Sequence, residues 1–503
     1  MKAHLLILFP LLFGAIACKA KVQMPEKPTS YSVKNNQEIY DKLAVLKPGD
    51  SLLLADGEYT DLKLIATKSG LPEKLIIIAP KNPGKVFITG DAKVEIRADY
   101  TVLKGLYFKN GNRNPDQWKS HGPGVIAIYG SHNRVTECVF DNFDQANSAY
   151  ITTSLTASGQ VPKHCRIDHC VFVGKTTLDQ VINLNNGVAA VKDGSYAGPA
   201  MYHRIDHCFF SNPPKKGNAG GGIRIGYYRN DVGRCLVDSN LFYRQDSEAE
   251  IITSKSQENV FYANTIVNCQ GTLNFRHGDK QVALNNFYIS TDNKLGYGGM
   301  FIWGSKHIIA NNYFSLKKTI ASRGNAALYF NPGAKASEHA LAFDILLANN
   351  MFKDNAGYAI NFEPLLDRRI QDAKDQGLTF FLPYGINATG NAFIATASPK
   401  FDLFLGDVNQ QKFENNYSVG ISKNYGLGIK TLNANIAKED FYRPQELTGY
   451  QPSQFNNIPN IEGINLNIQQ IVNSGIKGKP LSWDDVRPSW LLEIPNDYWK
   501  DGE

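Results

Sequence analysis

The residues best suited to chemistry lie in one block of the sequence, DSEAEIITSKSQENVFYANTIVNCQGTLNFRHGD, at positions 246–279. Glu248 and Glu250 are two positions apart, Lys255 follows them, and Arg276 comes about twenty residues later. Because alternate residues of a β-strand point to the same side, the two carboxylates are predicted to share a face and to hold one cation. A repeat of similar length would return Arg276 to the side of Lys255. Two acids, a base and a strong cation on one wall suit removal of a proton next to a carboxylate.

A repeated triplet indicates how these residues are positioned. Cys138, Cys170 and Cys208 each begin a Cys-Val-Phe or Cys-Phe-Phe triplet, and asparagine takes the cysteine position farther along the chain. These asparagines are Asn240, Asn264, Asn286, Asn312, Asn350, Asn391 and Asn416. Repeats with such a period indicate a solenoid. Short strands separated by Asn and Gly, with almost no helical spacing, favour a parallel β-helix over a β-sandwich or a propeller.

The predicted fold is an all-β, single-stranded right-handed parallel β-helix with capped ends. Open solenoid ends leave strand edges unpaired and need a cap. Residues 37–46 have the apolar spacing of a helix and precede the first predicted strand at 51–54, so they are the predicted N-terminal cap. Beyond about residue 431 the strand pattern fades, and a C-terminal extension is expected to pack along the β-helix. The predicted division is a signal peptide at 1–17, the catalytic β-helix at 18–430 and the extension at 431–503.

The first 17 residues have the pattern of a targeting segment. Lys2 supplies the positive start, an apolar run follows, and Ala15-Ile16-Ala17 is a small-x-small cleavage site. The run is too short to span a bilayer, and no later stretch qualifies as a transmembrane segment. Export to the periplasm or the medium is therefore predicted, with Cys18 as a candidate site of lipid attachment.

Charge and cysteine content give broader expectations. The net charge of +6 over 503 residues favours a polyanionic partner. The blocks at 217–231, 246–279 and 322–344 resemble those of enzymes that act on acidic polysaccharides, so such a polymer is expected rather than nucleic acid, and the chain is expected to be a monomer. Among the seven cysteines, three recur at one repeat position, which predicts buried stacked thiols rather than disulfides or a zinc site.

Three long blocks of the chain resemble polysaccharide lyase family 6. They are the block at 246–279, GNAGGGIRIGYYRND at 217–231 and SRGNAALYFNPGAKASEHALAFD at 322–344. Within that family they are most similar to the chondroitinase B branch. The resemblance implies an exported calcium-dependent lyase that cleaves dermatan sulfate at N-acetylgalactosamine–iduronate linkages by β-elimination. A 4,5-unsaturated uronate would remain on one product.

The resemblance also implies roles for individual residues. The implied calcium ligands are Asn218, Glu248 and Glu250. The implied base and its cationic partner are Lys255 and Arg276. Residues that would orient these groups are His277 and Glu338, although His277 is equally compatible with simple packing. Implied substrate contacts are Arg323, Arg368, Arg369 and Trp303, where a core position for the tryptophan is the alternative.

The base and its partner each require a physical condition. Lysine has an ordinary pKa of ~10.4 and is protonated at neutral pH. Lys255 can therefore act as a base only if burial, Arg276 and a bound cation lower its pKa. Arginine is a poor acid, so Arg276 either protonates the leaving oxygen or stabilises developing charge while water donates the proton.

Other functions are compatible with part of the pattern. An alginate lyase of the same family would keep the mechanism and change the substrate. A non-catalytic glycan-binding solenoid would need the fold alone. A pectin-type hydrolase would need clustered aspartates, which the sequence lacks. Ala189 stands where chondroitinase B would show an arginine, so the sulfate preference is the least supported expectation.

Overall fold

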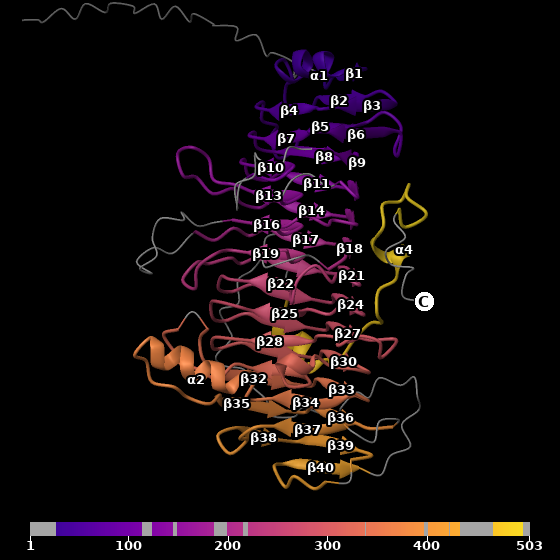
Figure 1. The fold of residues 1–503 in the computed structure, drawn as a ribbon. Helices are drawn as coiled ribbons and strands as arrows, with labels where there is room; N and C mark the ends of the chain where they lie inside the picture. The colour runs from indigo at the N-terminus through magenta and orange to yellow at the C-terminus, as the bar shows by residue number, and fades with distance from the viewer. Residues whose placement is uncertain are drawn as a thin grey trace, which may run out of the picture.

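The chain winds into a tall column of stacked coils (Figure 1). The computed structural model describes residues 27–112, 123–143, 148–185, 199–214, 220–337, 339–396, 401–421, 423–432 and 466–495. Three long sheets of 14, 14 and 12 strands run the length of the column, and neighbouring strands within each sheet pair in parallel. This arrangement confirms the predicted right-handed parallel β-helix.

Each complete coil contributes one strand to each sheet. Sheet A contains β1 (Ser30–Val33), β2 (Ser51–Leu54), β5 (Ile76–Pro80), β8 (Thr101–Lys104), β11 (Arg134–Thr136), β14 (Arg166–Asp168), β17 (Arg204–Asp206), β20 (Leu236–Asp238), β23 (Val260–Tyr262), β26 (Val282–Leu284), β29 (Ile308–Ala310), β32 (Phe343–Ala348), β35 (Tyr384–Thr389) and β38 (Lys412–Glu414). Sheet B contains β3 (Gly57–Thr60), β6 (Val86–Gly90), β9 (Tyr107–Gly111), β12 (Val139–Asp141), β15 (Val171–Val173), β18 (Phe209–Ser211), β21 (Leu241–Tyr243), β24 (Thr265–Val267), β27 (Phe287–Ile289), β30 (Tyr313–Ser315), β33 (Met351–Lys353), β36 (Ala392–Ile394), β39 (Asn416–Val419) and β40 (Ile429–Leu432). Sheet C contains β4 (Lys63–Ala66), β7 (Lys93–Ile96), β10 (Ile126–Ile128), β13 (Ile151–Thr153), β16 (Ile182–Leu184), β19 (Ile223–Ile225), β22 (Glu250–Ser254), β25 (Thr272–Phe275), β28 (Met300–Ile302), β31 (Ala326–Phe330), β34 (Gly357–Asn361) and β37 (Phe401–Leu405).

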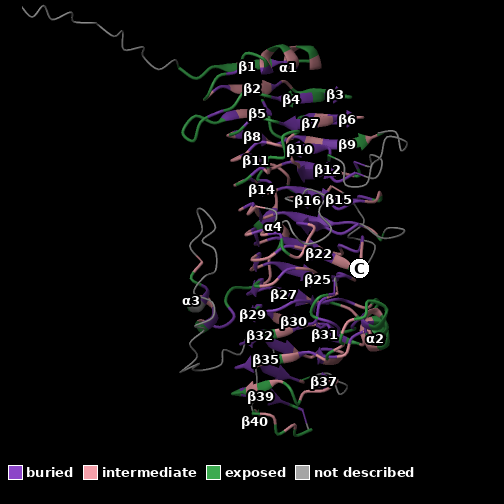
Figure 2. Cartoon of the chain, turned by 90° about the vertical axis from the view of Figure 1, so that its left-hand side faces the viewer, coloured by how far each residue is buried: buried purple, intermediate pink, exposed green. Residues whose placement is uncertain are grey.

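The core runs the whole length of the column, as the buried residues in Figure 2 show. The parallel register places like residues on like. Phe140, Phe172, Phe210 and Phe242 stack in order along the inside of sheet B, with ring centroids 5.5, 5.0 and 4.5 Å apart. Each coil buries its apolar residues only against its neighbours, so the stability of the column is spread over many similar interfaces.

The repeated asparagines form a hydrogen-bonded ladder between sheets A and B. Nδ2 of Asn240 donates to Oδ1 of Asn264 at 3.0 Å, and Nδ2 of Asn264 donates to Oδ1 of Asn286 at 2.9 Å. The same contact continues through Asn312, Asn350, Asn391 and Asn416. Each Oδ1 also accepts the backbone N–H of the preceding asparagine, so the buried turn leaves few polar groups without partners. The asparagines that recur in the sequence triplets therefore stack in register along the column.

We expect Asn286→Ala to lower the free energy of unfolding by about 1–3 kcal/mol, because a buried donor and acceptor lose their partners. The backbone N–H of Asn264 and the carbonyl of Phe261 both bond the Asn286 side chain. Urea unfolding would measure the change. Exposed Asn409 is the control, and Asn409→Ala should unfold like the wild type; equal midpoints for both variants would contradict the role of the ladder.

Two helices near the column differ in how well the sequence predicted them. The predicted cap is confirmed as α1 (Asn36–Leu43), where Asn35 accepts from the Glu38 N–H at 2.9 Å and Ile39 and Leu43 are buried. The sequence analysis did not predict α2 (Leu366–Asp375), which lies in the connection from β34 to β35. Its inner face is short, with Arg369 and Ala373 buried, so an apolar pattern was hard to detect.

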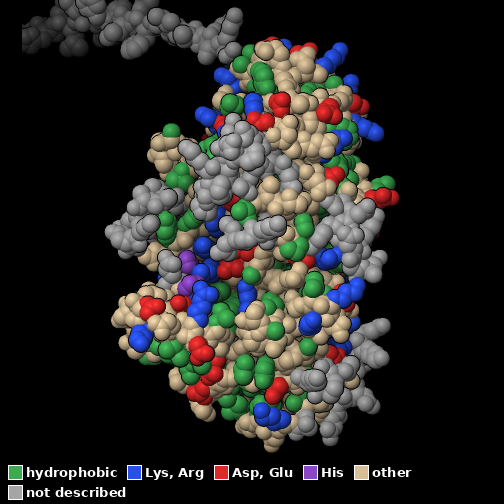
Figure 3. Space-filling view, viewed as in Figure 1, with side chains coloured by type: hydrophobic (Ala, Val, Ile, Leu, Met, Phe, Trp, Pro, Cys, Tyr) green, Lys and Arg blue, Asp and Glu red, His purple; other side chains and the backbone are tan. Residues whose placement is uncertain are grey.

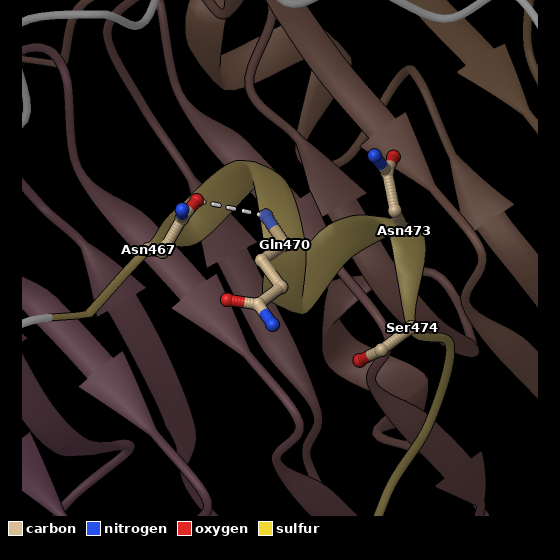
Figure 4. Close-up of a pocket in the computed structure, with 4 residues that line it drawn as sticks. All are labelled: Asn467, Gln470, Asn473 and Ser474. Atoms are coloured by element: carbon tan, nitrogen blue, oxygen red, sulfur yellow. Dashed lines mark hydrogen bonds between the residues drawn. The ribbon is translucent and has the colours of Figure 1, made fainter.

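The C-terminal segment packs on the outside of the coils. Helix α3 (Ile468–Asn473) lies on sheet A, and the segment around α4 (Trp483–Val486) lies on sheet B. Asn311 and Asn349 donate to the Ile471 and Val472 carbonyls at 2.6 and 2.8 Å. Figure 4 shows α3 with four polar side chains of the helix and its caps. The Gln470 N–H donates to Oδ1 of Asn467, which caps the N-terminus of the helix. The domain bounds at 430 and 431 stay a prediction.

The remaining expectations concern cysteines and targeting. The six cysteines in the described ranges are buried free thiols, and Cys138, Cys170 and Cys208 occupy equivalent positions in successive coils. Residues 1–17 and Cys18 lie outside the described residues. In the part of the chain that the structure describes, no helix is long and apolar enough to cross a membrane.

Candidate active site

Lys255 and Arg276 occupy equivalent positions on adjacent coils, directly after strands of sheet C. Ser254 and Phe275 are paired in the register of β22 and β25, so the residues that follow them lie side by side. The Arg276 N–H donates to the Ser254 carbonyl at 2.8 Å, which continues the parallel ladder. Neighbouring strands are about 4.8 Å apart. The predicted return of Arg276 to the side of Lys255 is confirmed. Figure 3 shows His side chains beside Lys and Arg side chains at mid-height on this face.

The acidic pair is arranged differently from the predicted strand pattern. Only Glu250 belongs to β22, and a register shift follows it, so that Ile251 and Ile252 both enter the core. Glu248 precedes the strand, and its Oε2 accepts the N–H groups of Gly220 and Gly221 at 2.7 and 2.9 Å. The prediction that alternation along one strand aligns the carboxylates is therefore wrong. A bulge and a glycine turn position them instead.

Three acceptors hold the Arg276 guanidinium. Its Nε lies 3.3 Å from Oε1 of Glu250. Its Nη1 is 3.4 Å from Nε2 of His277, and its Nη2 is 2.8 Å from Nε2 of His339. The guanidinium also lies 5.1 Å from the ring centroid of Trp303. Arg276 is thus fixed in direction by contacts from three different coils.

Both histidines are neutral in this environment. Burial, followed by the charges of Arg276 and Lys255, lowers the pKa of His277 well below its usual value. Burial and the charges of Arg276 and Arg369 lower the pKa of His339 to about 3. A neutral imidazole can accept a hydrogen bond from arginine through one ring nitrogen. His277 therefore contacts Arg276 through Nε2, and its ring also bonds the backbone of Tyr227.

The surroundings of Lys255 lower its pKa. Burial is the largest cause that lowers its pKa, and the positive charges of Arg224 and Arg276 act in the same direction. Glu250 and Glu248 oppose the shift. The pKa of Lys255 is lowered overall, as a general base requires.

Arg224 is a site residue that the sequence analysis missed. It lies on β19, one coil before Lys255, and its side chain is 5 % exposed. Its Nη2 bonds Oε1 of Gln180 and lies 3.6 Å from Oδ1 of Asp179. Arg224 belongs to the block at 217–231, one of the three that resemble the lyase family, and this position was a sequence signal for a role at the site.

The predicted substrate contacts differ in how far their side chains are exposed. Arg368 is exposed on α2, whereas Arg369 is 4 % exposed and bonds Asn331 and Asp372 at 2.8 Å each. Trp303 is also 4 % exposed, and the Phe301 ring stacks on it with centroids 4.0 Å apart. Arg369 and Trp303 are therefore buried among protein side chains, and little of either is exposed.

Arg323 reaches back toward the acidic segment. Its Nη2 donates to the Ala249 carbonyl at 3.0 Å, and its Nη1 donates to the Thr272 hydroxyl. Burial lowers its pKa, and the charges of Glu250 and Glu248 oppose that shift. Its guanidinium is therefore close enough to both carboxylates to interact with them. This side chain ties the connection before β31 to the residue between the two acids.

Several predicted residues lie outside the described ranges. They are Asn218, Glu338 and Ala189. His339, the neighbour of Glu338, makes the contact to Arg276 that was expected of the glutamate. Both residues lie in the block at 322–344, so the sequence pointed to the correct segment.

The acidic pair has the donor chemistry of a calcium site. Calcium prefers carboxylate and amide oxygens. Oε2 of Glu248 is held by two N–H groups, whereas Oε1 receives no hydrogen bond from the described residues. Glu250 contacts Arg276 and accepts from Thr253 at 2.8 Å. Within the described ranges no three His, Cys, Asp or Glu side chains converge, so an ion here would need an amide, substrate or water ligand as well. Glu248 and Glu250 fit calcium on these terms.

A parallel β-helix that carries a lysine and an arginine side by side after two strands of sheet C is compatible with a polysaccharide lyase of family 6. A family model described as Chondroitinase B matches residues 33–467, and the chain belongs to that family. The search of curated proteins found no match.

Solved structures of similar fold are also polysaccharide lyases. The family 6 alginate lyase AlyGC has a TM-score of 0.70 and 23% identity, covering 92% of this chain. The chain spans only 59% of AlyGC. A mannuronic acid-specific family 6 lyase from human gut microbiota has a TM-score of 0.64 and 23% identity, covering 81% of this chain and 91% of its own. The family 6 lyase Pedsa3628 from Pseudopedobacter saltans has a TM-score of 0.61 and 19% identity, covering 92% of this chain and 99% of its own. These likenesses show the fold.

Proposed function

We propose that the protein is a calcium-dependent lyase that cleaves dermatan sulfate at N-acetylgalactosamine–iduronate linkages. The observation that carries the proposal is the adjacency of Lys255 and Arg276 beside the acidic pair. Lys255 has a lowered pKa, and Arg276 is held by three acceptors. A base and a fixed cation that follow paired residues of neighbouring strands, whose backbones are about 4.8 Å apart, can act on neighbouring atoms of one sugar.

In the proposed reaction Lys255 takes the proton from C5 of the uronate. The electron pair of the C5–H bond becomes the C4=C5 double bond, and the C4–O bond breaks. The leaving oxygen stays on N-acetylgalactosamine and receives a proton from water or from Lys255. Arg276 stabilises the negative charge that develops, because arginine remains protonated and its direction is fixed before substrate binds.

The calcium ion would be held by Glu248 and Glu250 with Asn218. When bound, calcium would neutralise the uronate carboxylate and so make the C5 proton more acidic. His277 and His339 keep Arg276 in place, and Glu338 remains a candidate for the same task.

Dermatan sulfate is favoured by the family that the chain matches and by its basic charge. The match is to the Chondroitinase B family, and the net charge is +6. Arg368 is exposed on α2, and Arg323 lies between the acids and Phe301, so both are candidates for binding sulfate or carboxylate. Alginate is the second candidate, because similar solved structures are named alginate lyases and because Arg369 and Trp303 are buried in protein contacts.

The substrate test is incubation of the purified protein with dermatan sulfate, chondroitin 4-sulfate, chondroitin 6-sulfate and alginate. Formation of unsaturated uronate would be followed by ultraviolet absorbance. We expect dermatan sulfate to be cleaved well above both chondroitin sulfates, because the configuration at C5 decides which face presents its proton to Lys255. Equal rates on iduronate and glucuronate polymers would contradict this geometry. Turnover of alginate alone would establish the second candidate.

We also propose that the enzyme is exported and acts as a monomer. The targeting pattern at residues 1–17 supports export, and Cys18 is the candidate for lipid attachment. Mass spectrometry of the mature N-terminus would detect cleavage and any acyl group, and light scattering would give the oligomeric state. An uncleaved N-terminus on purified protein from the native host would contradict export through this segment.

A further inference from the structure

The column of positions that holds Lys255 continues far toward the N-terminus on sheet C. The residues after successive strands, from β22 back to β7, are Lys255, Gly226, Asn185, Ser154, Tyr129 and Arg97. The register of these strands is unbroken, through Ser254–Ile225–Leu184–Thr153–Ile128–Ile96. Arg97 is therefore on the same line as the base, five inter-strand steps away. At about 4.8 Å a step, the separation along the axis is about 24 Å.

A buried glutamate organises two cations at this distant end. Oε1 of Glu95 lies 2.6 Å from Nζ of Lys93, and Oε2 lies 2.6 Å from Nη2 of Arg97. Glu95 is 6 % exposed, whereas the side chains of Lys93 and Arg97 are 28 % and 55 % exposed. The Arg97 guanidinium also lies 5.6 Å from the Tyr129 ring centroid. The carboxylate is thus hidden below its partners, while both cations retain exposed surface.

A depression adjoins these cations between α1 and β4. It has a volume of about 440 Å³ and is lined by Tyr40, Leu43, Ala44, Lys63, Ile65 and Thr67. Lys63 pairs with Lys93 in the strand register and lies 2.8 Å from Asp91. Ile65 is 45 % exposed, and Thr67 follows β4 at the end of the same column. Apolar and aromatic surface flanked by lysines suits a sugar ring that carries negative charge.

We propose that Lys63, Lys93 and Arg97, which we call the N-terminal basic patch, bind an anionic sugar of the same polysaccharide chain that is cleaved at Lys255. The proposal rests on the proposed function. The three cations of the patch pair with two acids, Asp91 and Glu95, so the net charge of the group is +1. Glu95 is the more deeply buried of the two acids. A bound carboxylate or sulfate would share the exposed N–H groups of Lys93 and Arg97 without displacing Glu95.

The distance makes the patch a test of chain length. A span of about 24 Å requires several sugars between the patch and the cleaved linkage. A long polymer can occupy the cleavage site at Lys255 and the N-terminal basic patch at once. Once it is bound at one of the two, its binding at the other is intramolecular. A tetrasaccharide cut at its central linkage has only two sugars on each side and would not reach the patch. The patch would therefore favour cleavage inside long chains.

The experiment compares kcat/KM on polymer and on tetrasaccharide. For Lys93→Gln/Arg97→Gln we expect a fall of about threefold to tenfold on dermatan sulfate polymer, the range for loss of exposed ion pairs, and no change on the tetrasaccharide. Because exposed charges are screened by salt, the difference on polymer should disappear at high ionic strength. In the double variant the buried Glu95 carboxylate loses both of its ion-pair partners. The triple variant Lys93→Gln/Glu95→Gln/Arg97→Gln also removes that carboxylate, and it should show the same loss on polymer as the double variant. Melting temperatures would verify that both variants fold.

Lys104→Gln is the matched control. Lys104 is 44 % exposed and lies 3.1 Å from Glu137, but it is on sheet A, away from the groove. Its substitution should change neither rate. Equal losses on polymer and tetrasaccharide, or no loss on polymer, would overturn the patch. If alginate is the polymer cleaved, the same comparison applies to alginate oligomers. Failure to cleave any of these polymers would refute the proposed function instead.

Discussion

Lys255→Ala is expected to abolish elimination while substrate still binds. General acid–base catalysis contributes about 10²–10⁴-fold to rate, and the loss should appear in kcat because proton transfer occurs only in the transition state. Steady-state kinetics would measure kcat, and calorimetry with uncleaved polymer would measure binding. Burial and two neighbouring arginines lower the pKa of this lysine, which is the direction that a base needs.

The pH dependence provides a second measurement on the same residue. The reacting form is neutral, so kcat/KM should rise with pH as Lys255 loses its proton. The midpoint should lie below ~10.4, the ordinary value for lysine, because the pKa is lowered by burial, Arg224 and Arg276. Arg224→Gln should move that midpoint upward, because a nearby positive charge is lost.

Lys280→Ala is the control for the substitution. Lys280 is 54 % exposed and pairs only loosely with Glu258, at 3.5 Å. It should retain wild-type turnover. If Lys255→Ala keeps a tenth or more of wild-type kcat, another group removes the proton and the assignment of the base fails.

Removal of calcium is expected to eliminate most activity, and added calcium should restore it. Magnesium should restore it poorly, since it requires a tighter octahedral set of ligands. Glu250→Ala should reproduce the effect of chelation and should also release Arg276 from one of its three acceptors. Calorimetric titration with calcium would report the site without reference to turnover, and bound calcium should raise the melting temperature by mass action.

Glu258→Gln is the matched control for the metal site. Glu258 is also partly buried and pairs with an arginine, Arg234, at 2.7 Å, but it lies outside the groove. Its substitution should leave calcium binding unchanged. Full activity of the wild-type enzyme in excess chelator, with no heat of calcium binding, would remove the ion from the mechanism.

The repetitive parts of this protein follow from its sequence alone. The triplets that begin at Asn240, Asn264 and Asn286 recur because one coil repeats, and a parallel ladder allows little freedom in how coils stack. The interval between Lys255 and Arg276 equals one short coil, so their adjacency was predictable. In contrast, α2 was missed, because the 41-residue interval from Asn350 to Asn391 indicates that a segment is inserted in this coil but not that the segment is helical.

Only the tertiary structure decided which groups surround the base and its partner. Glu248 reaches the site through a turn and a bulge, and His339 reaches Arg276 from 63 residues away. Neither contact depends on the coil period, because inserted connections vary in length and path. Whether Trp303 faces sugar or supports Arg276 likewise depends on burial, which alternation along one strand cannot predict. Backbone spacing in a parallel β-helix is set locally, whereas the orientation of a side chain in the groove depends on every loop that packs over it.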